Sequence, residues 1–399
     1  MADLDISAPI DEQAVRAWRL DRVRQGLAEA DMAGIVLVDP VNLRYATGSR
    51  NMQVWTMHNM VRYAFVATQG PVVLFETGAA QHLARGLETI DEIRPALSFD
   101  YMVVGERRHE MAGRMAAEIA DLARASGGGG RRLAIDRADL LAVSAFEAQG
   151  FELADGKPVM ERARAIKSVE EVRAFKQSLG VCEAGVAAMR AALRPGMRET
   201  EALAAMLQAS VALGAEYPET RLLTSGPRTN PWFQETSDRV IEAGDLLSFD
   251  TDLIGPMGFY TDISRSWVVG ETRPSDEQRT LYELARRQLE HNIGLLRPGI
   301  GFLEYAERSF ALPEAYIANR YADIAHGCGL GVEYPLIWYP EDADKGAYDG
   351  VFAENMIVCV ESYIGAEGGR EGVKLEQPVW ITADGPVVLS DYPLEDDYA

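Results

Sequence analysis

The stretch LLSFDTD, residues 246–252, is an apolar run that ends in two carboxylates. In an extended chain, residues two apart point to the same side, so Asp250 and Asp252 are expected on one face of a sheet. A second segment, FYTD at residues 259–262, follows a glycine-containing turn and adds Asp262. The pattern predicts two neighbouring strands that present carboxylates to one side.

The same arrangement recurs later in the chain. The run MIVCVE at residues 356–361 ends in Glu361, and VKLE at residues 373–376 brings Glu376 after another glycine-rich turn. His326 lies in a glycine-flanked segment and adds one imidazole. Each half therefore supplies carboxylates from two strands, and we expect all of them to meet on one sheet face.

The helices that precede these strands also repeat. Ser168 and Ser275 each begin a capping box ahead of apolar positions at helical spacing. Both helices end in the sequence LRPG, at residues 193–196 and 296–299, and a further helical stretch follows each. We interpret this as an internal duplication of two helix–helix–sheet halves related by a pseudo-two-fold axis.

Residues 1–160 are predicted to form a separate α/β domain, which leaves residues 161–399 for the duplicated domain. Strand-like runs and one helix alternate along the first domain, at residues 33–38, 70–75, 107–126 and 132–136. The glycine run at 127–130 lacks the Gly-Lys-Ser/Thr sequence of a phosphate-binding loop, so we interpret it as a surface loop. The predicted fold class is α+β with two domains.

Charge and composition narrow the function classes. The 399-residue chain carries 39 basic and 61 acidic side chains, a formal net charge of −22, so it lacks the basic face that nucleic acid binding requires. No apolar run approaches the ~18 residues of a membrane span, and the acidic amino terminus does not resemble a signal peptide. Three scattered cysteines argue against a disulfide framework. We therefore expect a soluble, cytoplasmic protein that binds neither nucleic acid nor membranes.

The predicted cluster of acids points to metal chemistry. Five carboxylates that face one interior repel each other unless cations pair them. Taken alone, each acid is also explained as a solvated residue at the end of a strand. Taken alone, His326 is also explained as a buried histidine whose hydrogen bonds are satisfied within the core. As a set, the oxygens and the imidazole suit two hard or borderline divalent ions such as Mn, Fe, Co or Zn. Two such ions leave one net negative charge, which favours a substrate with a cationic group.

Residues 165–385 resemble the pita-bread metalloenzymes, a family that contains methionine and Xaa-Pro aminopeptidases, prolidase and creatinase. The motifs that carry the resemblance are FD at 249–250, YTDISR at 260–265, HGCGL at 326–330 and KLE at 374–376. The resemblance implies a pita-bread catalytic domain that binds two metal ions through Asp250, Asp262, His326, Glu361 and Glu376. Residues 1–160 resemble the creatinase-type amino-terminal domain, which implies a homodimer with that domain near the partner's active site.

The chain departs from the family's peptidases at three places. They have a histidine shortly after a Ser-Gly turn, where this chain has GPRTNPWF at 226–233. They have an Asp and a second histidine where this chain has Gly331 and Glu333. Asp252 is an additional acid where peptidases usually have glycine. The groups that would hold a peptide carbonyl and protonate the amine are therefore missing.

The departures resemble one branch of the family, the pita-bread dimethylsulfoniopropionate lyases. The matching segments are NMQVW at 51–55, TRLLTSGPRTNPWFQE at 220–235 and FDTDL at 249–253. This resemblance implies cleavage of a small sulfonium zwitterion to dimethyl sulfide and acrylate, typically with iron and with Asp252 as a sixth ligand. It also implies that Tyr321 belongs to the active site.

Aromatic side chains are candidates to bind the cationic sulfonium by cation–π contact, although each taken alone is also explained by core packing. The four candidates are Trp55, Trp232, Phe233 and Trp338.

The catalytic base has several candidates. The lyases carry an Asp at the position of Val332, whose side chain cannot accept a proton. Tyr321, Glu333 or a hydroxide held by the metal are the substitutes, and Tyr321 needs help from nearby charge because its reference pKa is ~10. Alternatively, the chain acts on another small zwitterion, or it hydrolyses Xaa-Pro or ring-amide substrates. A non-catalytic binding module is a further alternative, against which the complete ligand set argues.

Overall fold

The computed structural model describes residues 8–126 and 131–395. Contacts divide the chain into two units: one is Asp11–Arg164, and the other runs from Ala165 onward together with the segment at 8–10. The division falls at the end of helix α7, Lys157–Ala165. We call them the amino-terminal unit and the carboxy-terminal unit.

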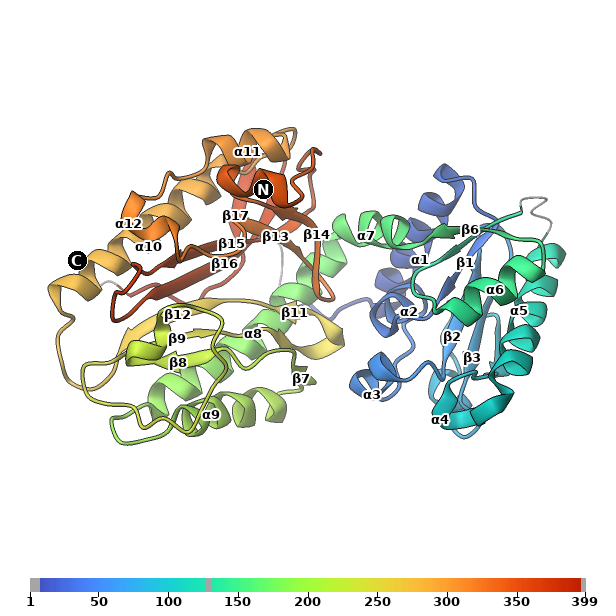
Figure 1. Cartoon of the computed structure of the whole chain (residues 1–399), viewed down its shortest axis with the longest axis horizontal. Helices are drawn as coiled ribbons and strands as arrows, with labels where there is room; N and C mark the ends of the chain where they lie inside the picture. The colour runs from blue at the N-terminus through green and yellow to red at the C-terminus, as the bar shows by residue number, and fades with distance from the viewer. Residues whose placement is uncertain (1–7, 127–130, 396–399) are drawn as a thin grey trace. The chain divides into compact units, whose positions relative to one another are not determined.

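A six-stranded mixed sheet forms the centre of the amino-terminal unit (Figure 1). Its order is β4-β3-β2-β1-β5-β6, with antiparallel pairs in the middle and parallel pairs toward both edges. The three central strands are buried along their whole length, which explains their continuous apolar sequences. The strands are β1 Gly34–Leu37, β2 Tyr63–Ala67, β3 Val72–Glu76, β4 Glu92–Pro95, β5 Arg132–Ile135 and β6 Glu152–Asp155.

Helices cover this sheet and complete its core. Alanine and methionine side chains of the long helix α5 pack with the phenylalanines of β2 and β3. Asp11, Asp39 and Asp139 cap three helices by accepting hydrogen bonds from backbone N–H groups in the first turn. The helices are α1 Glu12–Glu29, α2 Pro40–Thr47, α3 Gln53–His58, α4 Tyr101–Val104, α5 Arg108–Ala125 and α6 Leu140–Ala148, followed by α7.

Two halves of similar build make up the carboxy-terminal unit. Each half begins with a long helix that starts in a complete capping box, formed at Ser168 with Glu171 and at Ser275 with Gln278. A second helix follows each one after the LRPG turn. The helices are α8 Val169–Ala192 and α9 Glu199–Ala212 in the first half, and α10 Asp276–Leu295, α11 Phe302–Arg308 and the short α12 Glu314–Ile317 in the second.

The strands of this unit form two three-stranded sheets and one five-stranded sheet. The first half contributes the orders β12-β9-β8 and β11-β10-β7, and the second half contributes β14-β13-β15-β16-β17. Strand β12 lies against β16, which joins the two halves (Figure 1). The strands are β7 Tyr217–Pro218, β8 Leu223–Ser225, β9 Leu246–Asp250, β10 Leu253–Ile254, β11 Tyr260–Thr261, β12 Ser264–Val268, β13 Ala325–Cys328, β14 Val332–Ile337, β15 Ile357–Ile364, β16 Val373–Thr382 and β17 Gly385–Val388.

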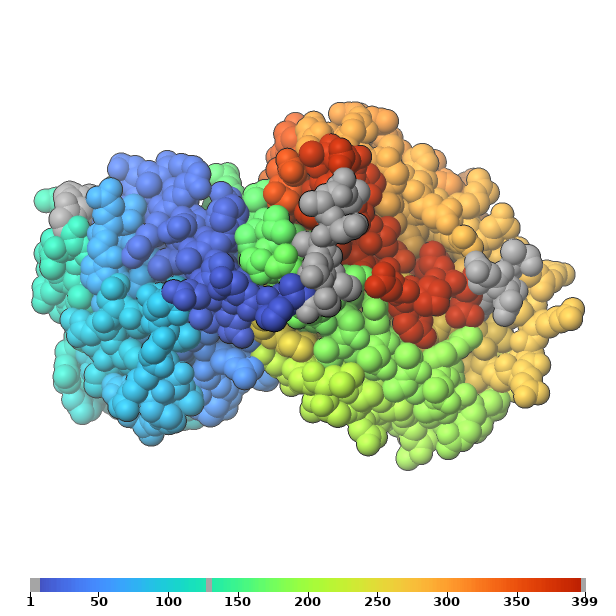
Figure 2. All heavy atoms as spheres, turned by 180° about the vertical axis from the view of Figure 1, so that it is seen from behind, coloured from blue at the N-terminus to red at the C-terminus, as the bar shows by residue number. Residues whose placement is uncertain are grey.

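The core of the carboxy-terminal unit lies between its helices and one face of these sheets. Apolar side chains of α10 pack against alternate residues of β15 and β16, among them Val358, Val360 and Leu375. Helices α8 and α9 and the segment that follows them form the lower outer surface of this unit when it is seen from behind. They are green and lime in Figure 2. Because side chains alternate along a strand, the residues between the core positions point to the opposite face, where the predicted ligands lie.

The structure confirms the predicted α+β fold class with its two kinds of unit. The predicted strands at 33–38, 70–75 and 132–136 correspond to β1, β3 and β5, and the predicted helix at 107–126 corresponds to α5. The predicted surface loop at 127–130 lies outside the described residues. Among the residues that are described, no helix has the length and apolar character needed to cross a membrane.

Candidate metal centre

The first half of the carboxy-terminal unit brings three aspartates together. Asp250 ends β9, Asp262 lies between β11 and β12, and Asp252 follows β9 with a positive φ of 39°. One carboxylate oxygen of each lies within 4.8 Å of the others, and all three side chains are buried. The acids come together as expected, but Asp252 does so through a left-handed backbone after the end of β9 and not by continuing an extended strand.

The second half adds two glutamates from neighbouring strands. Glu361 of β15 stands directly opposite Glu376 of β16 in the antiparallel register. Oxygens of both lie within 4.8 Å of an oxygen of Asp250, so the acids of the two halves form one cluster. Both glutamates are completely buried.

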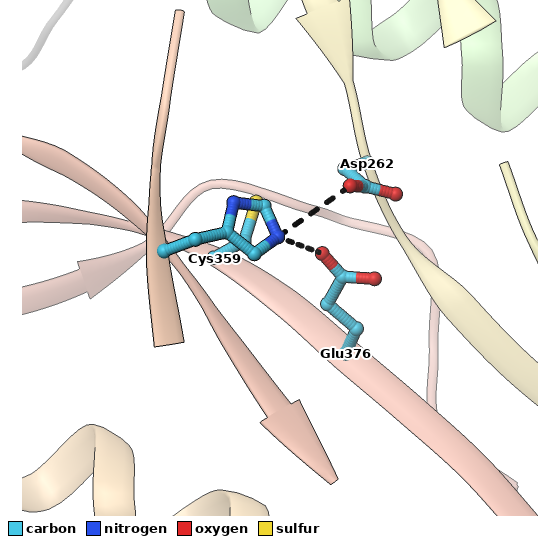
Figure 3. Close-up of side chains that lie close together, drawn as sticks. Asp262, Cys359 and Glu376 are labelled. Carbon is cyan, nitrogen blue, oxygen red and sulfur yellow. Dashed lines mark ion pairs between the residues drawn. The ribbon is translucent and has the colours of Figure 1, made fainter. Parts of the chain in front are cut away.

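His326 of β13 points its Nε2 into this cluster. Nε2 lies 3.8 Å from Oδ2 of Asp262 and 3.8 Å from Oε1 of Glu376 (Figure 3). It also lies 3.5 Å from Oε1 of Glu361. Nδ1 lies 3.0 Å from the carbonyl oxygen of Gly327. Burial by itself lowers the pKa of His326, but the contact with Glu361 and the charges of the surrounding carboxylates raise it well above its ordinary value. Because Nδ1 has a backbone partner, Nε2 is the atom directed at the site.

The buried acids of the cluster repel each other and need cations to compensate their charge. Burial, together with the charges of Glu376 and Asp250, raises the pKa of Asp262 well above its ordinary value. Burial and the charge of Glu361 do the same for the pKa of Glu376. Oε1 of Glu376 is buried and accepts no hydrogen bond from the residues described. Divalent cations would reduce the repulsion between the carboxylates and would give Oε1 of Glu376 a partner. The donor set therefore fits two hard or borderline metal ions.

Lys374 is a member of the cluster that was not predicted from the sequence. Its Nζ lies 2.6 Å from Oε2 of Glu361, 2.9 Å from Oδ2 of Asp250 and 3.3 Å from Oε2 of Glu376. The available signal was its position two residues before Glu376, which places both side chains on the same face of β16. With this ammonium included, five carboxylates and two divalent ions make a neutral centre, which corrects the net negative charge inferred from the acids alone.

Asp252 is held in place by two hydroxyl groups. Thr220 and Tyr260 donate hydrogen bonds to its two carboxylate oxygens. Burial and the charge of Asp250 raise the pKa of Asp252 to about 7, and the two hydrogen bonds oppose that rise. The resemblance implied that Asp252 is a ligand, but the residues that orient it could not be identified from the sequence.

Aromatic side chains lie beside the cluster. The ring of Tyr321 is 4.4 Å from Nζ of Lys374 and stacks on Phe233 with 5.2 Å between ring centroids. Trp232 is buried, 5.9 Å from the same Nζ and 5.8 Å from the ring of Tyr363. Two of the predicted substrate or catalytic side chains, Tyr321 and Trp232, therefore lie beside Lys374, and Phe233 lies against Tyr321.

Other predicted site residues lie elsewhere. Glu333 forms a buried ion pair with Lys167, with 2.5 Å between Oε1 and Nζ, and Val332 is half exposed at the start of β14. Trp338 lines a cavity of about 240 Å³ with Phe302 and other residues, none of which is a predicted ligand. Trp55 belongs to α3 of the amino-terminal unit, where its side chain is exposed.

Family comparisons agree with this fold. Residues 173–383 match the model of metallopeptidase family M24, and residues 19–166 match the creatinase/prolidase amino-terminal domain. The chain belongs to metallopeptidase family M24. Enzymes of this family are dinuclear metalloenzymes, and the buried acids and imidazole described above are groups that can bind such ions.

Two relatives match nearly the whole chain. A protein of Roseovarius nubinhibens named dimethylsulfoniopropionate lyase DddP is 39% identical over 96% of this chain and 87% of its own length. A protein of the same name from Roseobacter denitrificans is 36% identical over the same shares. The Xaa-Pro dipeptidase of Pyrococcus furiosus is 28% identical over 57% of this chain and 63% of its own length.

Solved structures show the same architecture. An Xaa-Pro dipeptidase from Bacillus anthracis superposes with a TM-score of 0.77 at 20% identity, over 95% of this chain and 99% of the other. Prolidase from Pyrococcus furiosus gives a TM-score of 0.72 at 21% identity, over 93% and 99%. At these identities the likeness establishes the creatinase-type and pita-bread fold and leaves the reaction to be argued from the site.

Proposed function

We propose that the protein is a dinuclear metal-dependent lyase that cleaves dimethylsulfoniopropionate, or a closely related small zwitterion, by β-elimination. The observation that carries the proposal is Asp252, a buried carboxylate in the cluster at a position where the resemblance implies that the family's peptidases usually have glycine. Its two hydroxyl donors give it a fixed orientation toward Asp250 and Asp262. Similarity to two proteins named dimethylsulfoniopropionate lyase over most of the chain supports the same reaction.

The residues that would hold the metals are Asp250, Asp252, Asp262, His326, Glu361 and Glu376, with iron proposed first and Mn, Zn or Co as substitutes. Bound cations would supply Lewis acidity that makes the proton next to the substrate carboxylate easier to remove. In the elimination a base takes that proton, its bonding electrons form the carbon–carbon double bond, and the sulfide leaves with the electrons of the carbon–sulfur bond. Acrylate, dimethyl sulfide and a proton are the products.

We propose Tyr321 as the base in place of the Asp that Val332 replaces. Burial and the charge of Glu361 raise the pKa of Tyr321 well above 10, whereas the nearby ammonium of Lys374 lowers it. A cation in the cluster would act in the same direction as Lys374 and favour the phenolate. Glu333 is the weaker candidate, because its carboxylate is engaged by Lys167.

The sulfonium would bind against aromatic faces next to Tyr321. Phe233 is 56% exposed and stacks on the Tyr321 ring, so one of its faces is open to a ligand. Trp232 is buried against Lys374 and Tyr363 and is better suited to form the wall of the site. Cation–π contact of a desolvated sulfonium with such a ring would contribute ~1–2 kcal/mol.

Release of dimethyl sulfide from dimethylsulfoniopropionate by iron-loaded protein tests the proposal. The wild type is compared with two variants. Asp262→Ala removes a ligand that lies close both to Asp250 and Asp252 and to His326 and Glu376. Val332→Asp introduces the Asp that the lyases carry at this position. Release by the wild type and not by Asp262→Ala supports the lyase and requires a base other than residue 332. Activity only in Val332→Asp means that the natural substrate is a different zwitterion.

Hydrolysis is the second candidate, favoured by the similarity to the Xaa-Pro dipeptidase of Pyrococcus furiosus. The same three proteins are therefore assayed on an Xaa-Pro dipeptide. Hydrolysis by the wild type, with no dimethyl sulfide from any of the three, would replace the lyase proposal with a peptidase. A homodimer and a cytoplasmic location stay predictions, and light scattering of the full chain checks the first of them.

A further inference from the structure

Cys359 lies on the face of β15 that carries the metal-site residues. It stands opposite His326 in the antiparallel register of β13 and β15, and Glu361 is two residues further along the same strand. Side chains two apart in a strand point to the same side, so Cys359 and Glu361 both face the cluster while Val358 and Val360 face the core. The thiol is therefore directed toward the acids by the same alternation that places Glu361.

The distances around the thiol fit a metal site. Sγ of Cys359, a ring nitrogen of His326, and one oxygen each of Asp262 and Glu376 all lie within 4.8 Å of one another (Figure 3). All four side chains are buried, and Cys359 has no exposed surface. Oε1 of Glu376, the oxygen that accepts no hydrogen bond from the described residues, lies 3.8 Å from Nε2 of His326. A buried, unpartnered carboxylate oxygen thus points to a ligand independently of the thiol.

A neighbouring cysteine provides a contrast. Cys328 is buried in β13, and its Sγ donates a hydrogen bond to the carbonyl oxygen of Tyr260 at 3.2 Å. It is not part of the group of four donors around Asp262. The two thiols are in hydrogen-bond contact, but only Cys359 is placed among the candidate ligands, so Cys328 separates the effect of a neighbour from that of a ligand.

We propose that Sγ of Cys359 is a ligand of the cation that Asp262, His326 and Glu376 hold, so that one of the two metal sites has a sulfur donor. The inference rests on the proposed metal centre and adds a ligand to it. When the sulfur–metal bond forms, the thiol loses its proton to solvent, and no oxidant or reductant is needed. A thiolate makes this site softer than one built from oxygen and nitrogen alone, so it selects Fe²⁺, Co²⁺ or Zn²⁺ over Mn²⁺ and Mg²⁺.

Cobalt substitution tests the ligand without an activity assay. Metal-free full-length protein is titrated with Co²⁺ under anaerobic conditions, and the near-ultraviolet spectrum is compared for the wild type, Cys359→Ser and the matched control Cys328→Ser. We expect a sulfur-to-cobalt charge-transfer band in the wild type and in Cys328→Ser and its loss in Cys359→Ser. Cobalt affinity of the affected site should fall roughly tenfold or more in Cys359→Ser, at least as much as when an outer-shell partner is lost.

X-ray absorption of the zinc-loaded wild type gives a second measurement that needs no variant to fold. A sulfur neighbour at ~2.3 Å, averaging about half a sulfur per zinc when both sites are filled, is the expected result. Bound zinc with only oxygen and nitrogen neighbours at ~2.0–2.2 Å would overturn the sulfur ligand and leave the dinuclear centre intact. A protein that binds neither metal would overturn both the ligand and the proposed metal centre.

Discussion

Nζ of Lys374 lies 2.9 Å from Oδ2 of Asp250, although the two residues belong to different halves of the duplicated unit. The ammonium also contacts Glu361 and Glu376 and is completely buried. Burial lowers the pKa of Lys374, but the surrounding carboxylates raise it well above its ordinary value, so the side chain is a fixed positive charge. It ties the two halves together and compensates part of the charge of the ligands.

Lys374→Met should destabilise the metal-free protein by about 3–5 kcal/mol, because it leaves buried carboxylates without their cation. Divalent metal should restore most of that loss, since bound cations can replace the missing charge. Thermal unfolding with and without metal measures both effects. Lys345→Met, which removes an exposed lysine paired with Asp342, is the control and should change stability by less than about 1 kcal/mol. Equal losses in the two variants would contradict a special role for Lys374.

Tyr260→Phe and Thr220→Val each remove one of the hydroxyl groups that orient Asp252. Because outer-shell partners set the geometry and basicity of a ligand, we expect the affinity for one of the two ions to fall by roughly 10–100-fold while the other is retained. Isothermal titration calorimetry, in which the metal ion is added to metal-free protein, separates the two binding events. Thr280→Val, which removes a hydroxyl that bonds within helix α10, should leave both affinities unchanged. Unchanged binding in Tyr260→Phe and Thr220→Val would mean that Asp252 does not bind metal.

Stability of the metal-free chain should depend on pH through Asp136, a buried aspartate of the amino-terminal unit. Burial raises its pKa from 3.8 to about 7, and the hydrogen bonds from Val38 and Asn42 only partly oppose the rise. Between these two pH values the folded chain holds a proton that the unfolded chain has lost, so stability falls as pH rises from about 4 to about 7. The contribution amounts to roughly 4 kcal/mol over that range.

Chemical denaturation of the full chain at about pH 5 and about pH 8 measures this slope. In Asp136→Asn the decrease should be smaller than in the wild type, because the titrating group is gone. Asp121→Asn, at a position whose side chain is 81% exposed, should keep the wild-type slope. A slope that does not change in Asp136→Asn would assign the pH dependence to other groups.

Sequence patterns predicted those elements of the molecule whose signature is contained within a few neighbouring residues. Capping boxes, apolar strands and paired acids each have a signature within a few residues, so α8, α10, β9 and β15 could be located from the sequence. The pattern of acids on neighbouring strands predicted that Asp250 lies near Asp262 and that Glu361 lies near Glu376.

Contacts between distant segments could not be predicted in the same way. The ion pair of Lys167 with Glu333 and the position of Trp338 in a separate cavity depend on how β14 packs, which no local pattern specifies. Cys359 was missed for a different reason. Its alternation with Glu361 was visible in the sequence, but a cysteine in an apolar strand is ordinarily a core residue.

The two candidates for the catalytic base make opposite predictions. Tyr321→Phe removes the hydroxyl of the ring that Lys374 contacts and should lower kcat of the lyase reaction by about 100-fold or more, with metal content and melting temperature unchanged. Glu333→Gln leaves Lys167 as a buried, unpaired cation and should lower stability by about 3–5 kcal/mol while kcat of the folded enzyme stays within about threefold. Lys167→Met should resemble Glu333→Gln in both respects, because either change breaks the same ion pair. Metal content, melting temperature and kcat measured together on the three variants decide between the residues. Loss of kcat in Glu333→Gln, with full activity in Tyr321→Phe, would reverse the assignment.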